Sequence, residues 1–71
     1  MAYTVKQARM LKGFSRKYMA DALGISERSY FSKEMKPGTF KAWEIEKFLQ
    51  TVGMGYYDII FVNEPITNVK E

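Results

Sequence analysis

Short apolar stripes at helical spacing recur along the chain, and glycines or a proline–glycine pair separate them. The first stripe comprises Val5, Ala8 and Lys12, with Arg9 beside them. Thr4 precedes this stripe and Gln7 follows three residues later, which is a capping-box pattern because each side chain can accept a hydrogen bond from the other residue's backbone N–H. The pattern predicts a first helix that ends at Gly13.

Two further short helices are predicted on either side of Gly24. The apolar positions of the first of them are Met19, Ala20 and Leu23. Ser15 can cap this segment, and Gly24 stops it after barely two turns. Ile25 then enters the core, and Ser26 caps a segment that runs to about Met35. Two helices bent around a glycine are a layout that many DNA-binding proteins use to present a helix to the major groove.

The strongest periodicity follows the Lys36-Pro37-Gly38 break. Its apolar positions are Ala42, Ile45, Phe48, Leu49 and Val52. We expect Thr39 to cap this helix and Gly53 to end it. The run 56–62 is ambiguous, because its β-branched and aromatic residues suit a strand while its place after a helical hairpin suits a fifth helix. We favour a short helix followed by an extended tail that includes Pro65.

These elements predict an all-α fold, a compact bundle of four to five short helices with a short extended C-terminal tail. Residues 1–62 form the domain and residues 63–71 the tail. The chain has no cysteine and no histidine, which excludes disulfides, thiolate or imidazole catalysis and the usual zinc ligand sets. We therefore expect no enzymatic activity, no metal and no cofactor. The N-terminus lacks a signal-peptide pattern, so we expect a cytoplasmic protein that does not enter a membrane.

Charge is unevenly distributed along the chain. Residues 1–41 hold nine Lys or Arg and three acidic residues, a net charge of +6, whereas residues 42–71 hold two and five, a net charge of −3. A surface that faces phosphates needs such a basic half, because neutralised phosphates release their counterions. The alternative is a solvated surface that is merely rich in lysine.

The order and spacing of these residues resemble the helix-turn-helix domains of phage Cro proteins and phage repressors, the XRE or Cro/repressor-like family. The matching pieces are Val5-x-x-Ala8-Arg9-x-x-Lys12-Gly13-Phe14-Ser15, Met19-Ala20-x-x-Leu23-Gly24-Ile25-Ser26, Glu34 and Val52-Gly53. The resemblance covers Val5 to about Ile60. It implies a lambda repressor-like fold over residues 1–62 and a small phage or prophage regulator of transcription, a repressor that binds double-stranded operator DNA as a homodimer.

The resemblance also assigns roles to single residues. In the family, the positions of Arg9 and Glu34 form an ion pair between helices one and three; the alternative is two separate surface charges. Arg16 occupies a position that touches phosphate beside a helix N-terminus, and Lys17 and Lys36 are expected to contact phosphate as well.

The base-reading positions of the family map onto Ser26, Glu27, Arg28 and Ser32. Arg28 can make a bidentate contact to guanine, and Glu27 can accept a hydrogen bond from cytosine. Both residues also have alternative roles that do not involve bases: Glu27 can complement the helix dipole, and Arg28 can form an ion pair with Glu27. Phe31 is expected to contact a thymine methyl group or a sugar.

The sequence departs from the family pattern at Lys33 and at Met35-Lys36, which replace the common Asn-Gly after Glu34. Lys33 stands where the family usually has an apolar or aromatic residue, on the inward side of the helix with Tyr30 and Glu34. Phe31 and Met35 point outward, one turn apart, and form a small apolar patch. Thymine methyl groups can occupy such a patch, but so can a protein. The alternative function is therefore a protein-binding module, such as an antirepressor or antitoxin-like partner that binds a repressor.

The C-terminal aromatic cluster suggests self-association. Its large apolar residues are Tyr56, Tyr57, Ile60 and Phe61. They are too many for one small core, so we expect them to cover a two-fold seam between protomers.

Overall fold

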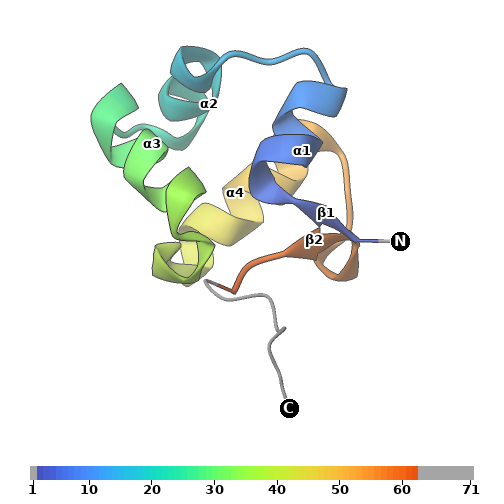
Figure 1. Ribbon diagram of the computed structural model, residues 1–71. Helices are drawn as coiled ribbons and strands as arrows, with labels where there is room; N and C mark the ends of the chain where they lie inside the picture. Colours follow the sequence, from blue (N-terminus) through green and yellow to red (C-terminus); the bar gives the residue numbers. More distant parts are fainter. Residues whose placement is uncertain (1, 63–71) are drawn as a thin grey trace.

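The computed structural model describes residues 2–62, which form a small, mostly helical domain (Figure 1). The α-helices are α1 (Val5–Leu11), α2 (Arg16–Leu23), α3 (Glu27–Met35) and α4 (Ala42–Val52). Two 3-10 turns, η1 (Pro37–Thr39) and η2 (Tyr56–Asp58), and two short strands, β1 (Tyr3–Thr4) and β2 (Ile59–Ile60), complete the fold. In Figure 1, α2 and α3 form one end of the domain and the two strands lie at the other end.

Side-chain caps set the beginnings of the first three helices, as the sequence predicts. Thr4 and Gln7 form the reciprocal capping box of α1, with N–H···O distances of 3.0 and 2.9 Å. Ser15 and Ser26 each accept a hydrogen bond of 3.0 Å from the backbone N–H three residues later. Gly24 ends α2 in the left-handed conformation with φ +73°, which a residue with a Cβ rarely adopts.

The predicted cap of α4 is wrong. Thr39 belongs to η1, where its hydroxyl donates to the carbonyl of Lys36 at 2.7 Å and is therefore used by the turn. The chain then continues extended through Phe40, which is buried, and α4 begins only after Lys41. The backbone N–H of Lys41 donates to Oε1 of Glu44 at 2.8 Å. Phe40 and Lys41 therefore lie between η1 and α4, and this extended segment places Phe40 in the core.

The predicted compact bundle of short helices is confirmed, and the two ends of the domain add a parallel sheet of two strands with two residues each. Tyr3 pairs with Ile59 and Thr4 with Ile60. The predicted fifth helix is reduced to the single 3-10 turn η2, which Asp58 closes by accepting the N–H of Gly55 at 2.9 Å. The predicted tail 63–71 lies outside the described residues.

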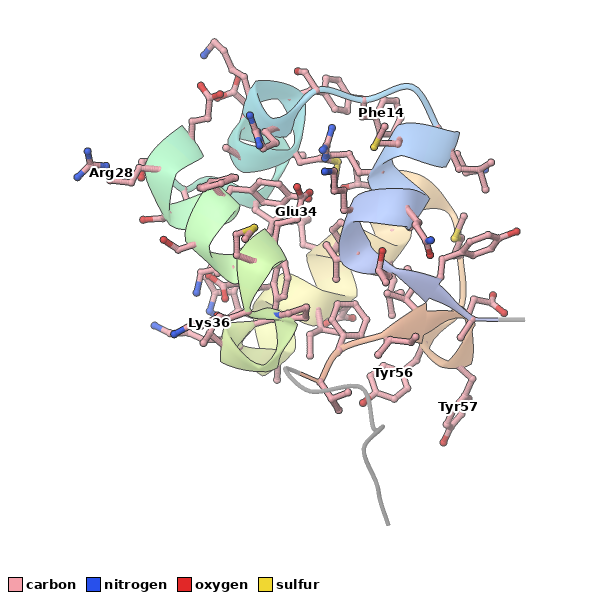
Figure 2. The ribbon with its side chains drawn as sticks, in the orientation of Figure 1. Phe14, Arg28, Glu34, Lys36, Tyr56 and Tyr57 are labelled. Carbon is pink, nitrogen blue, oxygen red and sulfur yellow. The ribbon has the colours of Figure 1, made fainter. Side chains whose placement is uncertain are left out.

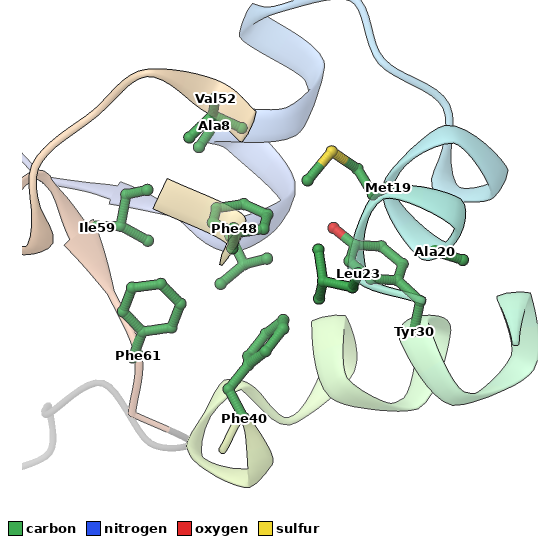
Figure 3. Close-up of a cluster of buried hydrophobic side chains, with 11 residues drawn as sticks. Ala8, Met19, Ala20, Leu23, Tyr30, Phe40, Phe48, Val52, Ile59 and Phe61 are labelled. Atoms are coloured by element: carbon green, nitrogen blue, oxygen red, sulfur yellow. The ribbon is translucent and has the colours of Figure 1, made fainter. Parts of the chain in front are cut away.

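The core lies between α1, α2, α3, α4 and β2 (Figure 3). Its buried members are Val5, Ala8, Met19, Ala20, Leu23, Tyr30, Phe40, Phe48, Val52, Ile59 and Phe61. Three phenylalanine rings of the core, those of Phe40, Phe48 and Phe61, lie 5.6 to 5.9 Å apart between centroids. Such aromatic pairs add to the stabilisation from apolar burial. Lys12, which the sequence places on the first apolar stripe, is exposed instead, because it follows the last residue of α1 as its C-cap.

Candidate nucleic-acid interface

The corner between α2 and α3 determines how α3 is presented. Ala20 is 1% exposed, which lets the two helix backbones approach closely. The backbone N–H of Ile25 reaches back to the carbonyl of Ala20 at 3.0 Å across the bend at Gly24. Met19 and Leu23 are buried beneath the corner. The two-helix unit that the sequence predicts is therefore present with its expected core residues.

Arg9 and Glu34 form an ion pair between α1 and α3, and both residues are buried. Nε of Arg9 lies 2.7 Å from Oε2 of Glu34, and Nη2 lies 3.2 Å from Oε1. Nη1 donates to the carbonyl of Phe14 at 2.8 Å, and the Tyr30 hydroxyl donates to Oε2 at 2.8 Å. The alternative of two separate surface charges is wrong.

The network changes the acid–base behaviour of its members. The hydrogen bond to Glu34 raises the pKa of Arg9 above its ordinary value, with the charge of Glu34 acting in the same direction and burial against it. Burial raises the pKa of Tyr30 far above its ordinary value, and the hydrogen bond to the Glu34 carboxylate adds to this effect. Arg9 thus remains charged and Tyr30 neutral, which keeps α3 linked to α1.

Four cationic side chains are exposed around α3 and the N-terminus of α2: Arg16, Lys17, Arg28 and Lys36. In Figure 2, Arg28 projects from the outer side of α3 and Lys36 lies beyond its C-terminal end, whereas Glu34 points inward to α1. Lys17 contacts Asp21 at 3.6 Å, with both side chains largely exposed. Such an exposed pair is weak and leaves the ammonium group accessible to a phosphate.

The predicted base-reading side chains are exposed: Ser26, Glu27, Arg28 and Ser32. The Oγ of Ser26 accepts the N–H of Ser29, which leaves the proton and one lone pair of its hydroxyl for another partner. Glu27 lies in the first turn of α3, where it complements the helix dipole. A pair between Arg28 and Glu27 does not occur among the ion pairs of residues 2–62.

The outward apolar patch is present, but one of its members has a partner. Met35 is 64% exposed and Phe31 41%. The guanidinium carbon of Arg16 lies over the Phe31 ring, 4.6 Å from its centroid. Phe31 and Met35 line one shallow groove with Arg28, Ser32 and Lys36. The groove combines cationic, hydroxyl and apolar groups along the outer face of α3.

The sequence analysis did not predict a second ion pair, which joins the partly buried Lys33 to the buried Glu44. Nζ of Lys33 lies 3.1 Å from Oε1 of Glu44, and the two side chains are only 16% and 3% exposed. The ammonium group also donates to the carbonyl of Thr39 at 3.3 Å. The predicted inward position of Lys33 on α3 is confirmed, and an inward cation is the sequence signal that points to a carboxylate partner. The pair links α3 to α4 and supports the presentation of α3 from its C-terminal end.

The residues of the predicted dimer seam differ in exposure, although the Tyr56 ring contacts the rings of both Phe61 and Tyr57. Phe61 is 8% exposed and packs in the core of its own chain, so its assignment to a seam is wrong. Ile60 is half-buried in β2, whereas Tyr56 and Tyr57 are 51% and 91% exposed. In Figure 2 the two tyrosines lie at the strand end of the domain, away from Arg28.

Comparison with known families and curated proteins finds no family model and no curated protein that matches the chain. Within residues 2–62, no helix is long and apolar enough to span a bilayer. The same residues contain no group of three or more His, Cys, Asp or Glu arranged to hold a metal ion.

Proposed function

We propose that the chain is a sequence-specific DNA-binding regulator of Cro type that places α3 in the major groove of operator DNA. The observation that carries this proposal is the cationic and polar outer face of α3. Arg16, Glu27, Arg28 and Phe31 line one hollow, and Arg28 and Lys36 line the groove beside it. Three cations of the basic half, Arg16, Arg28 and Lys36, thus line two hollows that share Arg28 and Phe31.

Phosphate contacts come from both ends of this surface. Arg16 and Lys17 are the first two residues of α2, where the helix dipole also favours an anion. Lys36 follows the last residue of α3. A duplex laid along α3 therefore meets cations at two separated places, which fixes the register of the protein without reading sequence.

Base reading is assigned to side chains in the first two turns of α3. Arg28 is exposed and has no carboxylate partner among the described residues, so its guanidinium group can make a bidentate contact to guanine. Glu27 can accept from the amino group of cytosine, and Ser32 can bond to several bases. A bound protein of this kind represses transcription by excluding the polymerase from the operator.

A second candidate function rests on the exposure of Phe31 and Met35. A protein partner, such as a repressor, could bury both side chains in a helix-in-groove contact. Aromatic anchors of such interfaces commonly cost more than about 2 kcal/mol of binding energy when truncated. The cations around the patch favour DNA, because they suit phosphates better than an apolar groove.

The experiment that tests the proposal is selection of preferred sites from a random duplex library, followed by affinity measurements on Arg28→Ala. We expect this variant to lose about 1–3 kcal/mol on the preferred site and to relax selection at one base pair. The matched control is Lys36→Ala, which should weaken binding to all duplexes equally. Unchanged site preference in Arg28→Ala would remove this residue as a reader. A wild-type protein that selects no site but captures a repressor would favour the second function.

A further inference from the structure

The contact between Arg16 and Phe31 joins the first residue of α2 to the middle of α3. The guanidinium carbon lies 4.6 Å from the ring centroid, within the range of a cation–π interaction. Arg16 has no carboxylate partner among the ion pairs of residues 2–62, whereas its neighbour Lys17 contacts Asp21. The Phe31 ring is thus the group that holds this exposed arginine in place.

The geometry leaves the hydrogen-bonding capacity of Arg16 unused. The ring attracts the guanidinium charge through its π face and needs no hydrogen bond, and the Arg16 side chain makes none with the described residues, so the N–H donors that do not face the ring remain available. A phosphate can therefore bind to these donors without displacing the ring. A free arginine loses side-chain entropy when it binds, and an arginine already held by a ring loses less.

We propose that Phe31 is a positioning residue that orients Arg16 for a DNA phosphate, and that it does not read a base. This inference rests on the proposed DNA-binding function. It revises the sequence-based expectation that Phe31 contacts a thymine methyl group. Phe31 has a face covered by Arg16, and its side chain is exposed less than that of Met35 one turn further along α3. Its effect on binding is therefore independent of the DNA sequence.

The test is a set of double-mutant cycles, measured by titration with a random-sequence duplex and with a selected site. Phe31→Leu keeps an apolar side chain but removes the ring. We expect it to lose affinity about two- to fivefold on both duplexes, the range for an exposed cation–π contact. Phe31→Trp, which restores an aromatic face, should recover most of the affinity. The loss should disappear in an Arg16→Ala background and persist in a Lys17→Ala background.

A readout without DNA tests the contact itself. In the NMR spectrum of the free protein, the side-chain protons of Arg16 next to the guanidinium group should be shifted upfield by the ring current of Phe31. Phe31→Leu should abolish this shift, and Phe31→Trp should retain or increase it. Thermal unfolding of each variant checks that the domain remains folded. Absence of the upfield shift in the wild-type protein would overturn the proposal.

Three outcomes of the DNA measurements would also overturn it, and they differ from failure of the proposed function. Full affinity in Phe31→Leu would show that the ring does not assist Arg16. A loss that persists in the Arg16→Ala background would show that Phe31 acts by itself. A loss confined to duplexes that carry a particular thymine would make Phe31 a base reader. In all three the wild-type protein binds DNA, whereas failure of the proposed function appears as a wild-type protein that binds no duplex.

Discussion

Arg9 and Glu34, 25 residues apart in the sequence, meet through two N–H···O contacts of 2.7 and 3.2 Å in the interior between α1 and α3. Each partner has a further bond, Arg9 to the Phe14 carbonyl and Glu34 from the Tyr30 hydroxyl. Additional bonds of this kind offset the cost of burying two charges. The pair therefore fixes the angle at which α3 leaves the core.

Removing either partner should be strongly destabilising. Arg9→Met leaves the Glu34 carboxylate buried without its cationic partner, and Glu34→Gln leaves the Arg9 guanidinium without its anionic partner. Each substitution should lower the free energy of unfolding by about 3–5 kcal/mol. Denaturant unfolding measures this effect. The matched control is Lys17→Ala, which breaks the exposed pair with Asp21 and should cost less than about 1 kcal/mol. A loss in Arg9→Met as small as that in the control would show that the buried pair contributes little.

Tyr30 should make stability depend on alkaline pH. Because its pKa in the folded protein is raised above the unfolded value of about 10, its contribution is complete below pH 10 and is lost as pH rises toward the folded pKa. The wild-type protein should lose about 1.4 kcal/mol more per pH unit above pH 10 than Tyr30→Phe. Urea unfolding of both proteins from pH 8 to 11.5 measures the difference. Parallel profiles would contradict a buried, neutral Tyr30.

The local signals in the sequence predicted most of the fold. Thr4, Ser15 and Ser26 cap helices in the structure because a capping hydrogen bond depends on residues within one turn. Gly24 ends α2 for an equally local reason, its positive φ. Thr39 carried the same signal but failed as a cap, because the burial of Phe40 moved the start of α4 by two residues. A tertiary contact prevailed over the local preference there.

Contacts between distant residues were not predictable in the same way. The pairing of Tyr3 with Ile59 joins the two ends of the described chain, and a two-residue strand has no periodicity to reveal it. The bond between Lys33 and Glu44 needs two helices to be placed before the partners can be matched. The family resemblance predicted the ion pair between Arg9 and Glu34. The contact between Arg16 and Phe31 was found only in the structure.

Self-association, if it uses the C-terminal aromatic cluster, must use its exposed members. Tyr57 is 91% exposed and Tyr56 51%, whereas Phe61 belongs to the core. We expect a dimer on DNA, and Tyr57→Ser should weaken it without changing the stability of the monomer. Sedimentation of wild-type and variant protein, each with and without an operator duplex, measures the assembly. A wild-type protein that stays monomeric on DNA would exclude the seam.

Salt dependence of binding to a random duplex tests the central claim most directly. If Arg16, Lys17 and Lys36 each neutralise one phosphate, log K should fall against log salt concentration with a slope of about −2.7 per protomer, that is, about −0.9 for each phosphate. Arg16→Ala combined with Lys17→Ala should flatten the slope by about 1.8 and weaken binding to all duplexes alike. A slope near zero in the wild-type protein, or an unchanged slope in the double variant, would contradict the placement of DNA on α2 and α3.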